Sequence, residues 1–279
     1  MDADDRGGRT MTEQLQKKIQ QSIKLLQTTC GGKENVELAY SGGKDSDVIL
    51  QLAKEAGIKF TPRYKNTTID PPETIKHCKD NGVEILQPKE SFFEIVKKAG
   101  YPNRFHRLCC ARLKEYPTES DTVIVGIRRD ESKSRKKRYL EPTVCRVYSK
   151  KKRVQQILPI LYWTQDDVRN FIEDRNIKCH PLYYDEDGNF HAERRLGCEG
   201  CPLMSQRKRV EFFKGNPKWL KAWVKAGHDF YKDKPMDEYE MMVGMLFYKT
   251  IRELNEIQNG LFGKMDCKAL LEEKFGVKL

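Results

Sequence analysis

Apolar residues follow two alternating patterns along this chain, one typical of short buried strands and the other of amphipathic helices. Short runs rich in β-branched and aromatic residues predict strands at residues 36–40, 58–64, 83–86 and 122–127. Between and before these runs, apolar residues at helical spacing predict helices at residues 12–27, 47–56, 72–80 and 91–99. Strands that alternate with helices favour an α/β fold with a doubly wound parallel sheet, and this is the fold class that we expect.

The composition changes after the fourth predicted strand. Basic runs at residues 133–138 and 150–153 flank a stretch that resembles a hairpin and includes residues 144–148. Thr164 begins the next predicted helix with a capping box. From Ser205 onward the chain is predicted to be helical. Six large side chains of this helical part are expected in a core, namely Phe212, Trp219, Trp223, Phe230, Met245 and Phe247.

A glycine-rich hexapeptide joins the first predicted strand to the helix after it. Its sequence is Ser41-Gly42-Gly43-Lys44-Asp45-Ser46. Glycines let the backbone turn tightly and approach a ligand, and the positive end of the following helix favours an anion at the same place. The serines add hydroxyl groups, Lys44 adds a mobile positive charge, and Asp45 is a candidate Mg²⁺ ligand. The alternative is a turn that merely starts a helix.

The hexapeptide is not a Walker A loop, because Leu38 occupies the place of that motif's first glycine and Asp45 follows Lys44. It is identical to the signature of the PP-loop ATP pyrophosphatases, the adenine nucleotide alpha hydrolase-like superfamily. This resemblance implies that the loop holds the β and γ phosphates of ATP while a substrate oxygen attacks the α phosphate. Lys44 would then stabilise the leaving pyrophosphate, and Asp45 would help to hold Mg²⁺.

Four of the nine cysteines form a second motif. They are the vicinal pair Cys109-Cys110 and the C-x-x-C pair Cys198 and Cys201. Adjacent side chains diverge and fit poorly around one tetrahedral zinc, whereas each thiolate of a [4Fe–4S] cluster takes its own iron. A zinc site and a redox-active pair remain alternatives. The others are expected to be ordinary thiols: Cys30, Cys78, Cys145, Cys179 and Cys267.

The cysteine pattern resembles the phosphoadenylylsulfate and adenylylsulfate reductase family, in which such cysteines hold a cluster beside the nucleotide. Further ordered matches lie at residues 72–74, 126–132, 158–168 and 180–183, so that the resemblance spans residues 36 to about 205.

The match at residues 126–132 implies that Gly126 and Glu131 belong to the nucleotide site and that Arg128 meets phosphate or sulfate. A solvated surface pair of Arg128 and Arg129 is the alternative. Three residues before the vicinal cysteines are candidates to bind the substrate anion, namely Arg104, His106 and Arg107.

Two departures from that family point to one of its branches. The sulfate-activating reductases carry a degenerate loop and a catalytic cysteine in a Glu-Cys-Gly-Leu-His tail, whereas this chain keeps the intact loop and has only Cys267 near its end. This combination is closest to the branch that contains the DNA phosphorothioation sulfurtransferase and related RNA thiolases. In that branch ATP activates an oxygen by adenylation, and sulfur then replaces it. The resemblance therefore implies a sulfur donor, such as a cysteine desulfurase.

Charge and hydropathy bear on the partners and the location. The net charge of +11 suggests an anionic partner, for which tRNA or DNA is the expected acceptor. The two basic runs are expected to form a single positive surface that runs up to the active site, with a solvated, unspecific surface as the alternative. No membrane span and no signal peptide are expected, and the cysteine content fits a reducing, cytoplasmic location. Residues 1–10 are expected to be a loose tail, with Met11 as an alternative start.

These observations together predict an ATP-dependent sulfurtransferase that forms AMP and pyrophosphate. One alternative is an adenylylsulfate or phosphoadenylylsulfate reductase that makes sulfite, and another is a non-catalytic, redox-sensing nucleotide-binding protein. Three regions are expected: a tail and helix at residues 1–33, a nucleotide-binding PP-loop domain at residues 34–162, and a C-terminal region with the cluster loop and helices at residues 163–279.

Overall fold

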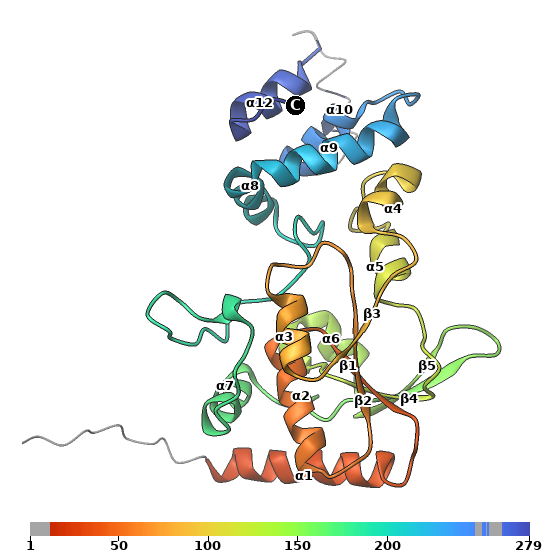
Figure 1. Ribbon diagram of the computed structural model, residues 1–279, viewed down its shortest axis with the longest axis vertical. Helices are drawn as coiled ribbons and strands as arrows, with labels where there is room; N and C mark the ends of the chain where they lie inside the picture. Colours follow the sequence, from red (N-terminus) through yellow and green to blue (C-terminus); the bar gives the residue numbers. More distant parts are fainter. Residues whose placement is uncertain (1–11, 249–252, 255, 257–263) are drawn as a thin grey trace, which may run out of the picture. The chain divides into compact units, whose positions relative to one another are not determined.

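The computed structural model of the chain describes residues 12–248, 253–254, 256 and 264–279 (Figure 1). The tail and the alternative start expected at residues 1–11 lie outside the described residues. The chain divides into two compact units. Unit 1 comprises Met1–Lys65, Pro72–Leu86 and Pro117–Leu196, and unit 2 comprises Asn66–Pro71, Gln87–Tyr116 and Gly197–Leu279. Each unit draws on residues from both sides of residue 162, and the three regions expected from the sequence remain a prediction.

A six-stranded sheet forms the frame of unit 1. Its strands are β1 (Val36–Tyr40), β2 (Thr61–Lys65), β3 (Glu84–Leu86), β4 (Thr122–Val125), β5 (Thr143–Val147) and β6 (Arg153–Ile157). The strand order is β3-β2-β1-β4-β6-β5, and every neighbouring pair is parallel except the antiparallel pair β5 and β6. The α/β fold with a mainly parallel sheet is therefore confirmed, with a hairpin strand added at one edge.

The strand order places a topological switch point between β1 and β4. From β1 the chain continues to β2 and β3 on one side, and it returns to β4 on the other side of β1. Ligands of such sheets bind at this crevice, outside the carboxyl ends of the two strands. The PP-loop (residues 41–46) follows β1, and Gly126 follows β4. The fold therefore brings two of the motifs singled out in the sequence to one place.

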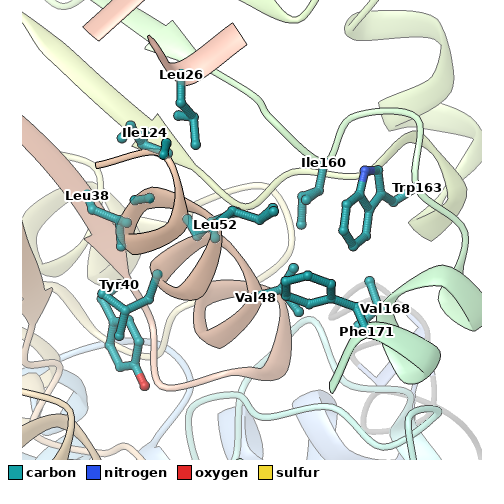
Figure 2. Close-up of a cluster of buried hydrophobic side chains, with 14 of the residues drawn as sticks. Leu26, Leu38, Tyr40, Val48, Leu52, Ile124, Ile160, Trp163, Val168 and Phe171 are labelled. Carbon is teal, nitrogen blue, oxygen red and sulfur yellow. The ribbon is translucent and has the colours of Figure 1, made fainter. Parts of the chain in front are cut away.

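Five α-helices accompany the sheet in the described part of unit 1: α1 (Glu13–Cys30), α2 (Lys44–Glu55), α3 (Thr74–Asp80), α6 (Lys133–Arg138) and α7 (Gln165–Asp174). α1 and α7 both pack against α2, and the core between them and the sheet is shown in Figure 2. Fully buried members include Leu26, Leu38, Leu52, Ile124 and Phe171. Val48, Ile49 and Leu52 of α2 are also buried, and the capping box at Thr164 is confirmed.

Helix α2 begins at Lys44, three residues earlier than the sequence pattern predicts. Gly43 is its N-cap, and the Ser46 hydroxyl donates to the Gly43 carbonyl oxygen at 2.6 Å. Asp45 and Asp47 stand in the first turn, where carboxylates interact favourably with the helix dipole. These polar residues gave no apolar periodicity, which is why the first turn was missed. The second half of the PP-loop is thus helical and fixed by the backbone of α2.

Unit 2 is built mainly from helices. They are α4 (Phe92–Ala99), α5 (Leu108–Leu113), α8 (Gln206–Gly215), α9 (Pro217–Tyr231), α10 (Glu238–Phe247) and α12 (Cys267–Phe275). α4 and α10 pack against α9, and α12 packs against α10 (Figure 1). Of the six side chains predicted in this core, Trp223 is fully buried and the other five are partly buried against it. No helix in the described part of the chain is long and apolar enough to cross a membrane.

The two basic runs, which were expected to form one positive surface, lie at opposite ends of β5. β6 pairs in parallel with β4, so that the run at residues 150–153 lies where these strands begin. The run at residues 133–138 forms α6, which follows the carboxyl end of β4. A five-residue strand, β5, separates the two runs, and at about 3.3 Å per residue its ends lie roughly 13 Å apart. The sequence pattern indicated the hairpin correctly. It did not show that the full length of β5 lies between the two runs.

Candidate functional site

The PP-loop turns sharply between β1 and α2. Gly42 has a φ of +75°, in the left-handed region that favours glycine. A Cβ atom at Gly42 would lie 3.1 Å from Thr74 Cγ2 and 3.2 Å from Leu196 Cδ2. The loop is also linked internally, because the hydroxyl groups of Ser41 and Ser46 lie 3.3 Å apart. The backbone is therefore held in one tight turn that leads into a helix N-terminus, an arrangement that binds anions.

Gly42→Ala should both destabilise the protein and impair the loop. An L-residue in the left-handed region costs roughly 1–2 kcal/mol, and the added methyl group also meets Thr74 and Leu196. Gly57→Ala is a matched control, because Gly57 has a φ of +64° with nothing within 4 Å of its Cβ position. Denaturant unfolding and ATP binding should be measured for both. We expect a larger loss of stability in Gly42→Ala and a loss of ATP affinity in that variant alone; equal behaviour would contradict the tight fit.

Lys44 is the buried cation of this loop. The residue is only 4% exposed, and its Nζ lies 3.4 Å from Asp45 Oδ2 and 5.5 Å from the centre of the Tyr183 ring. Burial lowers the pKa of Lys44, and the neighbouring Asp45 carboxylate opposes this shift. The buried ammonium group has one carboxylate nearby, and the 3.4 Å between them is long for an ion pair. An anionic ligand would neutralise the rest of its charge.

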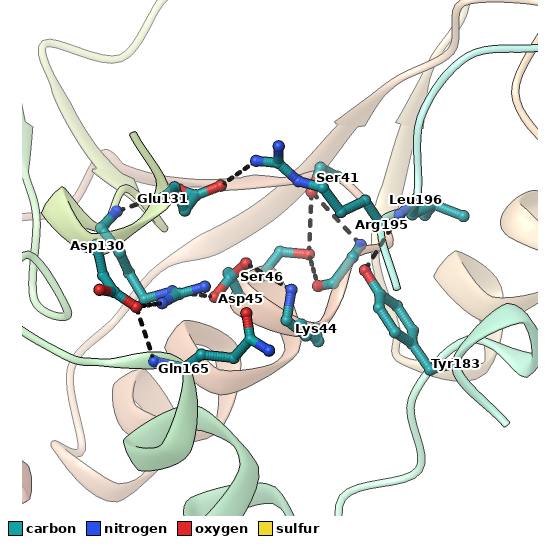
Figure 3. Close-up of polar contacts among 12 residues, drawn as sticks. Ser41, Lys44, Asp45, Ser46, Asp130, Glu131, Gln165, Tyr183, Arg195 and Leu196 are labelled. Atoms are coloured by element: carbon teal, nitrogen blue, oxygen red, sulfur yellow. Dashed lines mark hydrogen bonds and ion pairs between the residues drawn. The ribbon is translucent and has the colours of Figure 1, made fainter. Parts of the chain in front are cut away.

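Arg128 follows β4 and crosses to the PP-loop. Its Nε donates to Asp45 Oδ1 at 2.6 Å, and its Nη1 lies 3.4 Å from Asp130 Oδ2 (Figure 3). Arg128 is 2% exposed, which excludes the alternative of a solvated surface arginine. The approach of the two loops is close, since a Cβ atom at Gly126 would lie 3.0 Å from the Asp45 carbonyl oxygen. The structure therefore brings Lys44, Asp45, Gly126 and Arg128 together.

The two carboxylate oxygens of Asp45 are both engaged by cations. Oδ1 accepts from Arg128, and Oδ2 faces Lys44. Asp45 was expected to bind Mg²⁺, but a metal ion would have to compete with both cations for its oxygens. The contacts suit a role in positioning Arg128 better. In the described part of the chain, no group of three or more His, Cys, Asp or Glu side chains is close enough to hold one metal ion.

Glu131 gathers two further arginines beside the PP-loop. Its Oε1 accepts from Arg195 Nη2 at 2.8 Å (Figure 3), and its Oε2 accepts from Arg135. Burial lowers the pKa of Arg135, and the charge of Arg195 lowers it further. Glu131, expected at the nucleotide itself, thus contacts guanidinium groups. Arg135 and Arg195 were missed; the i,i+4 spacing of Glu131 and Arg135 is the one sequence signal that pointed to the first.

His180 supports the loop from the side of α3. Its Nδ1 accepts from the Leu182 N–H at 3.1 Å, so that Nε2 carries the hydrogen and donates to the Pro72 carbonyl oxygen at 3.0 Å. The Thr74 hydroxyl lies 3.2 Å from the same Nε2. Burial lowers the pKa of His180, which favours this neutral form. Because Thr74 packs against the Gly42 position, His180 helps to fix the wall of the PP-loop.

A buried polar cluster also involves the first turn of α2. Asp47 Oδ1 accepts from the Tyr40 hydroxyl and lies 3.0 Å from His77 Nε2. All three residues are at most 7% exposed. No sequence pattern pointed to this cluster, because its members come from β1, α2 and α3. It ties the first turn of α2 to two neighbouring elements and so stabilises the helix end that forms the anion site.

The four motif cysteines line one cavity within unit 2. Cys109 and Cys110 stand on α5, and Cys198 and Cys201 stand on the loop before α8. The rest of the lining is mostly apolar: Thr67, Ile69, Phe92, Leu113, Lys114, Pro202 and Trp223. Cysteine thiolates are the ligands of iron–sulfur clusters. The apolar walls around such a site control solvent access and so tune the reduction potential of the cluster. No three of these thiols lie close enough together to hold a single metal ion, but all four line the one cavity and are the candidate ligands of the expected [4Fe–4S] group.

Basic side chains accompany these thiols. Burial raises the pKa of Cys198 to about 11, with Lys114 opposing the shift. Lys114 Nζ also lies 3.6 Å from Asp70 Oδ1. At the other side of the cavity, hydrogen bonds from Cys109 and Arg107 lower the pKa of Cys110. These cations favour thiolates, which are the form in which cysteine binds metal.

Comparisons with known proteins found relatives of this chain. A family model described as "Phosphoadenosine phosphosulfate reductase domain" matches residues 35–204. The chain is 29% identical over 187 residues to adenosine 5'-phosphosulfate reductase 2 of Bacillus subtilis, covering 62% of this chain and 74% of that protein. It is 27% identical over 245 residues to sulfate adenylyltransferase subunit 2 of Caulobacter sp., covering 75% and 77%.

Two other matches are weaker or shorter. A phosphoadenosine 5'-phosphosulfate reductase of Buchnera aphidicola is 38% identical over 77 residues, but this match covers only 26% of this chain and 29% of that relative. Among solved structures, the U34-tRNA thiolase NcsA from Methanococcus maripaludis with its [4Fe-4S] cluster is 18% identical. It matches 91% of this chain and 83% of that one with a TM-score of 0.40.

Proposed function

Because this chain belongs to the phosphoadenosine phosphosulfate reductase domain family, we propose that it cleaves ATP between the α and β phosphates and uses the adenylyl group to prepare an acceptor for sulfur transfer. An acceptor oxygen attacks the α phosphorus, the bond to the bridging oxygen breaks, and pyrophosphate leaves. A sulfur nucleophile then displaces AMP from the activated acceptor. The observation that carries this proposal is the intact PP-loop at the switch point, with buried Lys44 and Arg128 aimed at it.

The PP-loop residues are assigned to the departing phosphates. The turn formed by Gly42 and Gly43, together with the hydroxyl groups of Ser41 and Ser46, binds the β and γ phosphates. Lys44 neutralises the charge that develops on pyrophosphate. Because Lys44 is buried and held near Tyr183, it is preorganised, and preorganised charges stabilise a transition state more than solvated ones do.

Arg128 is assigned to the activated phosphate. Asp45 fixes its guanidinium group through the 2.6 Å hydrogen bond at Nε, which leaves further donors free to meet an α-phosphate oxygen. Gly126 lets the end of β4 approach the loop closely enough for this contact. We assign Asp45 to positioning, and no step of the proposal requires it to bind Mg²⁺.

The cysteine cavity of unit 2 is assigned to sulfur chemistry. Cys109, Cys110, Cys198 and Cys201 would hold a [4Fe–4S] cluster, and Lys114 would offset the negative charge of the thiolates. When bound, such a cluster supplies iron that can carry or polarise a sulfur species. A cysteine desulfurase is the proposed class of sulfur donor.

A nucleic acid is the proposed acceptor, and α6 is the surface that supports this choice in unit 1. Lys136 and Lys137 are exposed on this helix, which follows the Arg128 loop directly. Replacing both by alanine should lower the slope of log affinity against log salt by about 0.9 per lost duplex phosphate contact, or about 0.7 on a single strand. Gel-shift titrations on tRNA and duplex DNA at several salt concentrations measure this.

Lys150 and Lys151 provide the matched control for that prediction. They are also exposed, but they belong to the run at the opposite end of β5. Replacing them by alanine should leave the slope unchanged. An equal change in both double variants would mean that only net charge matters, and would remove α6 from the proposal.

A second candidate function is favoured by the relatives themselves. Sulfate adenylyltransferase subunit 2 matches three quarters of this chain, and adenylyl transfer to sulfate would use the same PP-loop chemistry with a smaller acceptor. A reductase would instead need no ATP and would release sulfite. A non-catalytic redox sensor would release none of these products.

One anaerobic assay separates the four functions. The protein is supplied with α-labelled ATP and tRNA, with ATP and sulfate, or with adenylylsulfate and a thiol. AMP and pyrophosphate that require nucleic acid support the proposal. Adenylylsulfate formed from sulfate supports the second candidate, and sulfite supports the reductase. Absence of all products, with ATP bound, would leave the non-catalytic function.

A further inference from the structure

Phe105 stands out among the large apolar side chains of the described residues. It is 93% exposed, more than any other in this class. It lies in the segment of unit 2 that leads into α5, four residues before Cys109. A single exposed leucine or valine needs no explanation, whereas a phenylalanine held almost wholly in water forgoes about 1.5–3 kcal/mol of burial. Such a side chain is expected to have a partner.

The backbone holds Phe105 outward by a closed turn. Asn103 Oδ1 accepts the N–H groups of Phe105 and His106, both at 2.8 Å, and the Asn103 N–H donates to the His106 carbonyl oxygen at 3.2 Å. The start of the segment is anchored, because Tyr101 is buried and its N–H donates to the Tyr231 hydroxyl at 2.9 Å. The aromatic ring therefore stands on an ordered support, and a preorganised contact loses less entropy on binding.

Basic residues stand beside Phe105 in the sequence. Arg104 and Arg107 are its exposed neighbours, and the Arg104 guanidinium donates to the Met204 carbonyl oxygen at 3.3 Å, which ties the turn to the segment before α8. Arg207 and Lys208, in the first turn of α8, follow that segment, and both are exposed.

Two carboxylates partly offset these charges. Glu115 pairs with Arg107 at 3.1 Å, and Glu211 pairs with Arg207 at 2.8 Å. The Phe105 turn and the start of α8, which follows the segment that Arg104 contacts, therefore carry four cations against two carboxylates.

The same two segments carry the thiols of the cysteine cavity. Cys109 and Cys110 follow the Phe105 turn on α5, and Cys201 precedes Leu203, which is 48% exposed. A molecule that contacts both segments is therefore held next to the cavity, and the contact needs only residues of unit 2.

We propose that this Phe105 surface (Arg104, Phe105, Arg107, Leu203 and Lys208) binds a single-stranded segment of nucleic acid. A base stacks on Phe105, and the adjoining phosphates contact Arg104 and Lys208. One aromatic ring with flanking cations is the arrangement of single-strand binding platforms. A stable protein interface instead needs about 800 Å² on each partner with a contiguous apolar centre. The inference rests on the proposed nucleic-acid acceptor and specifies where its unpaired nucleotides lie.

Fluorescence anisotropy with end-labelled single-stranded RNA and DNA oligonucleotides tests this, using the anaerobically purified full chain. Phe105→Ala should weaken binding by about 5- to 150-fold, because one base stack is worth about 1–3 kcal/mol. Phe105→Trp should bind within about threefold of the wild type. Val147→Ala, at a 61% exposed apolar residue on β5 of unit 1, is the control and should bind as the wild type does.

Salt titration separates the two kinds of contact. Arg104→Gln and Lys208→Gln should each lower the salt slope by about 0.7, whereas Phe105→Ala should leave it unchanged. Wild-type affinity in Phe105→Ala overturns the proposal, even if nucleic acid binds elsewhere. If Phe105→Ala binds oligonucleotides normally but no longer accepts sulfur from a cysteine desulfurase, the surface serves a protein instead.

Failure of the proposed function has its own signature. Pyrophosphate release from ATP with sulfate as the acceptor is followed in parallel. If the wild type binds no oligonucleotide at low salt but forms adenylylsulfate, both the nucleic-acid acceptor and this inference are overturned. If it binds and requires nucleic acid for pyrophosphate release, the proposed function stands, and the Phe105 variants alone decide the inference.

Discussion

Lys44→Ala is expected to slow pyrophosphate release from ATP by about a hundredfold or more. Removing one preorganised group that stabilises a developing negative charge typically has an effect of this size. Lys44 qualifies because it is buried, its Nζ is fixed near Asp45 and Tyr183, and the PP-loop that contains it cannot easily rearrange around Gly42. The rate constant for the first turnover, measured with excess enzyme, reports on this step directly.

The effect should fall on the rate more than on ATP affinity, because the charge on pyrophosphate increases as the bond breaks. Lys54→Ala is the matched control, since Lys54 is an exposed lysine in the last turn of the same helix. Thermal unfolding must accompany the kinetics. Replacing a buried, incompletely paired cation can leave the stability of the protein unchanged or even raise it. A variant that is slower but as stable as the wild type therefore supports the assignment, because its slower rate does not come from unfolding. Unchanged turnover in Lys44→Ala would reject a catalytic role for the loop.

The parts of the molecule that the sequence predicted well are those determined by nearby residues. β1 begins and ends where the apolar run does, and the apolar face of α2 is recognised from the spacing of Val48 and Leu52. The hexapeptide stands out because its glycines and charges interrupt these two patterns. Helix α5 was missed, because its six residues are too few to show a period.

The parts that the sequence did not predict depend on pairing between distant segments. Arg195 reaches the PP-loop region only because Glu131, 64 residues earlier, accepts from it. The separation of the two basic runs follows from the parallel pairing of β6 with β4, which no local pattern encodes. Likewise, the sequence pattern of strands and helices continues without a break from residue 36 to residue 127. Residues 66–71 and 87–116 within this stretch nevertheless belong to unit 2. Local chemistry was therefore predictable, and its spatial partners were not.

The second large effect concerns the cysteine cavity. Anaerobically purified protein is expected to be brown and to contain iron and sulfide. Serine at any one of the four motif cysteines should remove most of the colour and iron, because a hydroxyl group is a poor replacement for a soft thiolate. The positions are Cys109, Cys110, Cys198 and Cys201. Visible absorption with iron and sulfide analysis measures the result.

Cys145→Ser is the matched control, because Cys145 is an exposed thiol on β5 of unit 1 and should leave the colour intact. Lys114→Met adds a test that does not remove a ligand. Its side chain lines the same cavity and compensates the Cys198 thiolate, so its loss should weaken retention of the cluster during oxidation while leaving the initial iron content near that of the wild type. If the purified protein contains one zinc ion and no sulfide, the cysteines form a structural zinc site and not a cluster. If it contains neither metal nor sulfide and two of the thiols readily form a disulfide, the thiols are a redox-active pair. Either result would remove the cluster from the proposed sulfur transfer.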